Sequence, residues 1–365
     1  MSIFIAIDCG KFNTKVSAYN SETEKVLQFR QRTKICDGTF DDDMFDKGTY
    51  ITQVDGGNVY KIGNGARIEA DLETSKKTEI HKVSTLSSIA VTLGAMGVKD
   101  EIADVYVAIG VPLQIANIPE ERIAYKNFIL GNDNEIHTVK IKTSPDGTPN
   151  VLKFRIVKKY VYPEGVGLLY RYPELITKPT AIIDIGNLNI NNIYVKEDFS
   201  VIMDQCFTDE LGAAILINGL SQMLTSTFAR CDENLVTSIL RKPLNERRLE
   251  PNDGNKDVME KSKKLIDEFL LEHVNTIKSK CDAHHYSLNY MNIIVTGGTA
   301  LFLKNELEQV FGKNTFIPDE PVYANAAGFL RKMCADHNVD VKFPEKSKEK
   351  KWWMNKIFEN IVESC

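Results

Sequence analysis

The chain has 365 residues, of which 43% are hydrophobic and 26% charged, and its formal net charge is −5. This length allows two domains with separate cores, and the negative balance gives the whole chain no electrostatic attraction to DNA. No apolar run approaches the ~20 residues that cross a bilayer, and the first run lacks the basic start of a secretory signal. The seven cysteines form no Cys-x-x-Cys pair, which favours reduced thiols in a cytoplasmic protein over disulfides or a zinc site.

The first half of the chain predicts mainly strands. Apolar runs on both sides of a glycine-containing turn predict a β-hairpin at residues 3–7 and 14–19. Further elements are expected as an acidic loop at 37–48, short strands within 50–62, a helix within 86–96, a strand at 105–111, a helix at 120–130, and strands at 136–142 and 151–161.

The second half predicts three strands within 181–204 and helices at 212–224, 256–280 and 322–335. Beyond a charged run at 346–351, apolar residues from Trp352 to Ile361 recur at helical spacing. We expect a short helix there that docks on the first domain or on a neighbouring subunit, because these side chains are too apolar to stay in water. A helix on a membrane surface is the alternative, with nearby lysines meeting anionic lipid.

One short pattern occurs twice. Asp8-Cys9-Gly10-Lys11-Phe12-Asn13 follows one apolar run, and Asp184-Ile185-Gly186-Asn187-Leu188-Asn189 follows another, 176 residues later. A glycine-bearing turn between strands exposes backbone N–H groups, and such a concavity binds anions, above all phosphate. Two copies in matching context predict two similar domains that hold a polyphosphate between them.

These hairpins, followed by Thr296-Gly297-Gly298-Thr299 after a third apolar run, resemble the actin, chaperone ATPase and sugar kinase superfamily. Their order and spacing are most similar to the bacterial ParM-type plasmid-segregation actins. The resemblance implies an α/β actin-like fold with two similar domains, each with a small subdomain, and a nucleotide cleft between them. Expected bounds are domain I at 1–175 with a small subdomain at about 37–80, completed by 325–365, and domain II at 176–324 with a small subdomain at about 211–285.

The resemblance also implies which residues bind ATP or GTP. The expected contacts are Gly10, Lys11, Phe12, Asn13, Lys15, Gly186, Asn187, Asn189, Gly212, Gly297, Gly298 and Thr299. Lys15 shares a strand face with Asn13 and would meet the β- and γ-phosphates, whereas Lys11 would contribute its backbone N–H. Gly297 and Gly298 would lie against the adenosine, although a Gly pair also suits an ordinary strand-to-helix turn.

The second hairpin departs from the family pattern, because Asn187 stands at the usual second glycine and Asn189 at the usual hydroxyl residue. Asparagine tolerates positive φ better than other non-glycine residues, so the turn remains feasible. Asp8 and Asp184, each at a strand end, would hold Mg²⁺ through water; capping of their own turns is the alternative for either one alone.

In the family, a glutamate in the context of Pro163-Glu164-Gly165 orients the water that attacks the γ-phosphate, and we assign Glu164 this catalytic role. An exposed turn glutamate is the plain alternative. The implied function is a nucleotide-hydrolysing protein whose filaments segregate plasmid DNA through a ParR-type DNA-binding adaptor, without direct DNA binding or membrane attachment. A monomeric sugar-kinase-type phosphotransferase and a chaperone-like ATPase are the alternatives.

Overall fold

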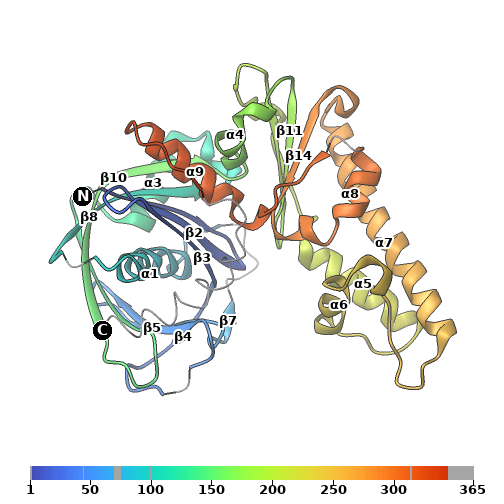
Figure 1. The fold of residues 1–365 in the computed structure, drawn as a ribbon, viewed down its shortest axis with the longest axis horizontal. Helices are drawn as coiled ribbons and strands as arrows, with labels where there is room; N and C mark the ends of the chain where they lie inside the picture. Colours follow the sequence, from blue (N-terminus) through green and yellow to red (C-terminus); the bar gives the residue numbers. More distant parts are fainter. Residues whose placement is uncertain (1, 44, 70–74, 99, 313–314, 344–365) are drawn as a thin grey trace. The chain divides into compact units, whose positions relative to one another are not determined.

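The computed structural model describes residues 2–43, 45–69, 75–98, 100–312 and 315–343 (Figure 1). The helix expected from Trp352 to Ile361 therefore lies outside the described residues. The chain divides into two compact units, one from Met1–Arg171 with Tyr323–Cys365 and one from Tyr172–Val322. None of the described helices is long and apolar enough to cross a bilayer. The six described cysteines form no disulfide with one another.

The described part of the first unit contains one sheet of ten strands in the order β3-β2-β1-β8-β10-β9-β5-β6-β4-β7. The strands are β1 (Ile3–Cys9), β2 (Asn13–Asn20), β3 (Lys25–Arg32), β4 (Lys34–Asp37), β5 (Thr49–Val54), β6 (Val59–Gly63), β7 (Ile68–Glu69), β8 (Ala103–Val111), β9 (Ile136–Lys142) and β10 (Asn150–Pro163). β1 pairs antiparallel with β2 and parallel with β8, and β8 pairs parallel with β10. The hairpin predicted at the N-terminus is confirmed.

Helices cover both faces of this sheet. α1 (Glu79–Ala95) and α9 (Ala324–Ala335) both pack on β1 and lie on opposite sides of the sheet in Figure 1. All seven residues of β1 are buried, as expected for a strand covered on both faces. The shorter helices of the described part of this unit are α2 (Leu113–Ala116), α3 (Pro119–Leu130) and α4 (Gly167–Arg171).

β10 is the strand on which two parts of this sheet meet. Residues Phe154–Pro163 pair with β8, whereas Asn150–Arg155 pair with β9, so the two pairings share only Phe154 and Arg155. The register with β8 also shifts between Ile156 and Lys158. The two pairings of β10 therefore overlap for only a short stretch, although β9 itself pairs with all the residues Asn150–Arg155 of β10.

Among its described residues, 172–312 and 315–322, the second unit contains a sheet of five strands in the order β13-β12-β11-β14-β15. The strands are β11 (Thr180–Ile185), β12 (Ile190–Val195), β13 (Phe207–Asp209), β14 (Asn292–Thr296) and β15 (Thr315–Phe316), and the helices are α5 (Ala213–Thr227), α6 (Glu233–Leu240), α7 (Lys256–Ala283) and α8 (Lys304–Phe311). Its core includes apolar side chains of β11, β14, α5 and α7.

The two sheets repeat one arrangement. In each, an antiparallel hairpin is followed by parallel partners, so that β3-β2-β1-β8-β10 has the same order and directions as β13-β12-β11-β14-β15. This repeat agrees with the two similar domains expected from the paired hairpins.

The prediction of three strands within 181–204 is wrong in its last strand. After β12, the chain turns at Phe199, whose φ is +67°, and Val201 makes only an isolated bridge to Val195. The third strand forms later, at β13. The apolar residues within 200–203 suggested a strand, but the turn at Phe199 prevents them from forming a continuous ladder with β12.

The small-residue helix α9 packs against α4 with almost no space between the backbones. A Cβ atom added to Gly328 would lie 1.7 Å from the carbonyl oxygen of Gly167. The Gly167 N–H donates to Asn325 Oδ1 at 3.3 Å. Glycine is required at this crossing because no side chain fits.

Candidate functional site

The first candidate phosphate turn joins β1 to β2. The Gly10 N–H donates to the Asn13 carbonyl at 3.0 Å and closes the turn. Behind the turn, the buried Thr33 donates its N–H to the Phe12 carbonyl at 3.0 Å and its hydroxyl to the Gly10 carbonyl at 2.7 Å. The carbonyl groups of Gly10 and Phe12 are thus held from behind, an arrangement that suits a turn whose N–H groups meet an anion.

Asp8 and Lys15 are cross-strand neighbours on the hairpin that carries this turn. The Lys15 ammonium donates to Asp8 Oδ2 at 3.0 Å, and their side chains are 23% and 8% exposed. A Cβ atom on Gly10 would lie 3.3 Å from Lys15 Nζ, so the ammonium lies directly over the turn. Lys15 therefore has the position expected of a group that contacts a phosphate bound there.

Lys11 and Phe12 belong to the same turn, and both side chains have neighbours outside it. The Lys11 ammonium donates to the Ser75 carbonyl at 2.8 Å. The guanidinium carbon of Arg32 lies 3.2 Å from the centre of the Phe12 ring. These contacts hold the two side chains against neighbouring segments and leave the backbone of the turn as the expected ligand-binding part.

Glu164 follows the last residue of β10 and lies near Asp8, beside the first turn. Its backbone N–H donates to the Val111 carbonyl at 2.9 Å. The parallel strands β1, β8 and β10 end side by side, which places Asp8, Gly110 and Glu164 next to one another. A Cβ atom on Gly110 would lie 3.4 Å from Glu164 Cγ and 3.8 Å from Asp8 Oδ1. Glycine at position 110 thus leaves room for two carboxylates.

Sequence reasoning missed the partner of Glu164, which is Lys76. The Lys76 ammonium forms an ion pair with Glu164 Oε1, and the two side chains are only 11% and 12% exposed. Burial opposes the charged ammonium, but the Glu164 and Asp8 carboxylates outweigh it and raise the pKa of Lys76 above its ordinary value. Nothing in the polar stretch around Lys76 distinguishes it from its neighbour Lys77 in the sequence.

The second candidate turn, between β11 and β12, repeats the bonding of the first. The Gly186 N–H donates to the Asn189 carbonyl at 2.9 Å, and the Leu188 carbonyl accepts from the Gly212 N–H at 3.0 Å. The Gly186 carbonyl accepts from the Ala213 N–H at 3.1 Å, at the start of α5. Asn187 has no positive φ, so the turn does not need glycine at that position.

The later glycine loop packs against this second turn. Gly297 has a φ of +90°, and a Cβ atom there would lie 2.2 Å from the Ile185 carbonyl oxygen and 2.8 Å from Asp184 Oδ1. The Thr299 hydroxyl donates to the Gly186 carbonyl at 2.9 Å. Gly298 begins the 3₁₀ helix Gly298–Leu301. Gly297 and Thr299 therefore support the turn, while Asp184 and Asn189 are half-buried beside it.

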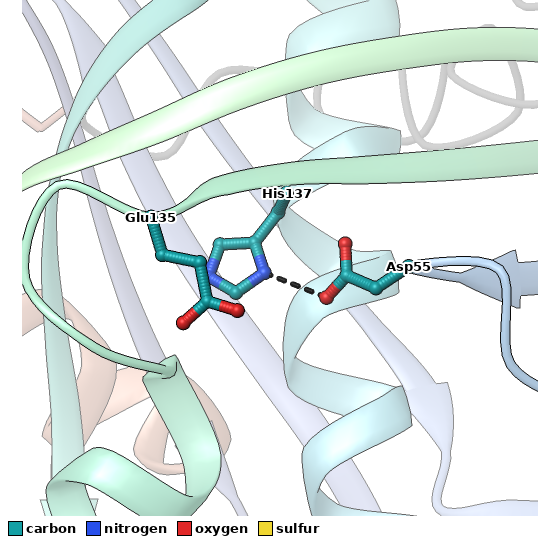
Figure 2. Close-up of side chains that lie close together, drawn as sticks. All are labelled: Asp55, Glu135 and His137. Atoms are coloured by element: carbon teal, nitrogen blue, oxygen red, sulfur yellow. Dashed lines mark hydrogen bonds and ion pairs between the residues drawn. The ribbon is translucent and has the colours of Figure 1, made fainter.

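Away from both turns, three described side chains have the spacing of a metal-binding group: Asp55, Glu135 and His137. Figure 2 shows the imidazole ring of His137 between the two carboxyl groups. Nδ1 lies 2.8 Å from Asp55 Oδ2, and Nε2 lies 3.2 Å from the Leu130 carbonyl oxygen. Both ring nitrogens thus face oxygen acceptors and are already hydrogen-bonded. We interpret the group as a structural link between the end of β5 and β9. The sequence did not predict it, because Asp55 lies far from Glu135 and His137 in the chain.

Comparison with known proteins identifies the fold. Residues 6–167 match the family described as the N-terminal domain of actin-like proteins. The archaeal actin homolog Ta0583 matches with a TM-score of 0.69 and 18% identity, covering 92% of this chain and 99% of the homolog. The chain has the actin-like fold, and its first unit carries an actin-like N-terminal domain.

Two further solved structures share this actin-like fold. The Alp12 filament structure has a TM-score of 0.66 and 21% identity, covering 92% of this chain and 99% of Alp12. The apo pSK41 ParM protein has a TM-score of 0.64 and 15% identity, covering 92% of this chain and 98% of ParM. No curated protein sequence matches the chain. The resemblance and the fold class predicted from the sequence are confirmed.

Proposed function

We propose that this actin-like protein binds and hydrolyses a nucleoside triphosphate and assembles into filaments in its triphosphate form. The observation that carries the proposal is the repeated hairpin. Each turn is closed by a glycine N–H that donates to an asparagine carbonyl, and each follows an aspartate at a strand end. The archaeal homolog has been solved in complex with ADP, which supports a nucleotide as the ligand. Both turns would bind the phosphates through backbone N–H groups.

The ionic groups of the first turn suit the terminal phosphates. Lys15 lies over Gly10 at the turn. When nucleotide binds, the Lys15 ammonium would leave the Asp8 carboxylate and form an ion pair with a phosphate, because a phosphate offers more negative charge. The freed Asp8 carboxylate fits Mg²⁺, which prefers oxygen ligands and keeps much of its water shell. Asp184 would be the matching carboxylate of the second turn. The metal would neutralise charge on the phosphates.

Glu164 would be the residue that orients and deprotonates the attacking water. A protein aids phosphoryl transfer mainly by positioning and by electrostatic stabilisation, so a carboxylate held at the ends of β1, β8 and β10 suits this task. We propose that filaments need bound triphosphate and that hydrolysis permits disassembly. Plasmid DNA would be the cargo, attached through a ParR-type DNA-binding adaptor.

The experiment that tests this function combines sedimentation with phosphate release for the wild type and Glu164→Ala. We expect the wild type to pellet with ATP or GTP and Mg²⁺ and to release phosphate. Glu164→Ala should still pellet but hydrolyse ~10²–10⁴-fold more slowly, the range for one acid–base group. A wild type that never pellets would favour the sugar-kinase or chaperone alternatives. A Glu164→Ala variant that hydrolyses normally would remove Glu164 from the mechanism.

A further inference from the structure

We propose that Lys76 is a positioning residue that holds the Glu164 carboxylate in its active orientation and links it to the first phosphate turn. This inference rests on the proposed function of Glu164 and adds a residue that the repeated hairpin does not contain. It starts from the ion pair between the Lys76 ammonium and Glu164 Oε1.

Burial makes this ion pair different from a surface pair. The two side chains are 11% and 12% exposed, so each charged group has lost most of its water. A buried carboxylate without a counter-charge takes up a proton or turns toward solvent. In the first state it cannot accept a proton, and in the second it no longer lies beside the attacking water. Lys76 supplies that counter-charge by a direct charge-assisted hydrogen bond.

The segment that carries Lys76 also contacts the phosphate turn. The Ser75 carbonyl, one residue earlier, accepts from the Lys11 ammonium at 2.8 Å. Two residues later, the Thr78 hydroxyl lies 2.7 Å from His81 Nδ1, at the start of α1. Lys76 is therefore held between the turn and a buried helix, and its side chain meets Glu164 from a fixed backbone position.

The surrounding charges leave Lys76 as the partner of Glu164. The other nearby ammonium, on Lys15, lies 3.0 Å from Asp8 and is assigned to the phosphates. His81 does not supply a positive charge, because burial, together with the Lys76 and Lys11 ammonium groups, lowers its pKa to about 3. Without Lys76, two carboxylates would share the ends of β1 and β10 with one ammonium.

The first test removes the ammonium with Lys76→Met and measures hydrolysis per polymerised subunit together with nucleotide affinity. We expect phosphate release to slow by ~10²-fold, the scale on which a misplaced reacting group loses rate, while the affinity for ADP changes little. Lys77→Met is the matched control, because Lys77 is the next residue and is exposed. Lys76→Arg keeps the charge and should retain much more activity than Lys76→Met.

The decisive measurement adds the double variant Lys76→Met with Glu164→Gln. If Lys76 acts through Glu164, the double variant hydrolyses no more slowly than Glu164→Gln alone. Normal hydrolysis by Lys76→Met beside a slow Glu164→Gln overturns this inference and leaves the proposed function intact. If the rate loss of the double variant equals the product of the two single losses, the inference is overturned as well, because Lys76 would then act independently of Glu164. Normal hydrolysis by Glu164→Gln instead overturns the role of Glu164.

If Lys76→Met does not fold, Lys76→Arg still tests whether Lys76 positions Glu164. Hydrolysis by Lys76→Arg that is much faster than by Glu164→Gln, with unchanged ADP affinity, supports a charge that positions Glu164. Loss of hydrolysis by the folded Lys76→Arg to the level of Glu164→Gln overturns the inference, since the counter-charge would be present without effect.

Discussion

Substituting Gly328 by alanine tests the close crossing of α4 and α9. The new Cβ atom would lie 1.7 Å from the Gly167 carbonyl oxygen, whereas real Cβ atoms essentially never approach within 3.0 Å. The two helices would have to separate by about 1.3 Å, the difference between these distances. Because both colliding groups belong to backbone segments, no side-chain rotation relieves the clash. We therefore expect the upper end of the usual overpacking range, about 3 kcal/mol of lost stability.

Gly94→Ala is the matched control, because it makes the same chemical change in α1, where no heavy atom lies within 4 Å of the added Cβ. That variant should gain about 0.5–1 kcal/mol, since alanine favours the helix. Urea unfolding followed by circular dichroism, without nucleotide, measures both changes. For a unit of this size, about 2–4 °C accompanies each kcal/mol, so Gly328→Ala should melt roughly 6–12 °C lower. A loss below about 0.5 kcal/mol would show that α4 and α9 can separate freely, and the reasoning would be refuted.

Three further variants test the first glycine turn, the Lys15 side chain beside it, and the hydrogen bond between His137 and Asp55. Thr33→Val removes the hydroxyl that donates to the Gly10 carbonyl and should lower the free energy of unfolding by about 1 kcal/mol; an unchanged urea midpoint would contradict this. Lys15→Ala should weaken triphosphate binding far more than diphosphate binding in a titration, and equal losses would leave Lys15 without a role at the terminal phosphate. Burial opposes the charged form of Asp55, but the hydrogen bonds from His137 and from the Thr138 N–H outweigh it and lower the pKa of this carboxyl. Asp55 therefore stabilises the fold at pH values above the ordinary aspartate pKa of ~3.9. Asp55→Asn should therefore cost about 1 kcal/mol at pH 6, and the difference from the wild type should vanish as the pH falls through the lowered pKa; a difference that persists in acid would refute the linkage.

The sequence predicted the elements whose patterns are local. Both glycine-containing hairpins, the strand at 105–111 and the amphipathic helix at 256–280 follow from short apolar runs and turn residues, and the structure has each of these elements. The repeated pattern also led to the actin-like fold, because a 176-residue repeat is visible without coordinates.

The start of α1 was missed because its first turns contain buried polar residues. The expected helix lay within 86–96, whereas α1 begins at Glu79. His81, Ser84 and Thr85 are buried in these first turns, before the predicted range begins. The Ser84 carbonyl also accepts a hydrogen bond from the Ser88 hydroxyl at 2.7 Å, so polar side chains can be buried along this helix. No apolar period marks such a segment.

The Lys76–Glu164 and Asp55–His137 pairs were missed for a different reason. Their members lie 88 and 82 residues apart in the sequence, and only the folded sheet brings them together. A single sequence contains no signal for such pairs when the residues belong to ordinary polar stretches.

The short overlap on β10 has a consequence for how the first unit opens. Within β10, only Phe154 and Arg155 pair with strands on both sides, so β9 can separate from β10, together with the four strands beyond it, while β1, β2 and β8 stay paired. In native-state hydrogen exchange, amides of β9 and β5 should therefore exchange through a partial opening, at a lower free energy than those of β1. His137 pairs with Phe154 across this junction and binds Asp55 at the end of β5. The hydrogen bond between His137 and Asp55 thus connects β9 to the end of β5, among the strands that we expect to open first. The number of β9 amides that exchange together should depend on this bond.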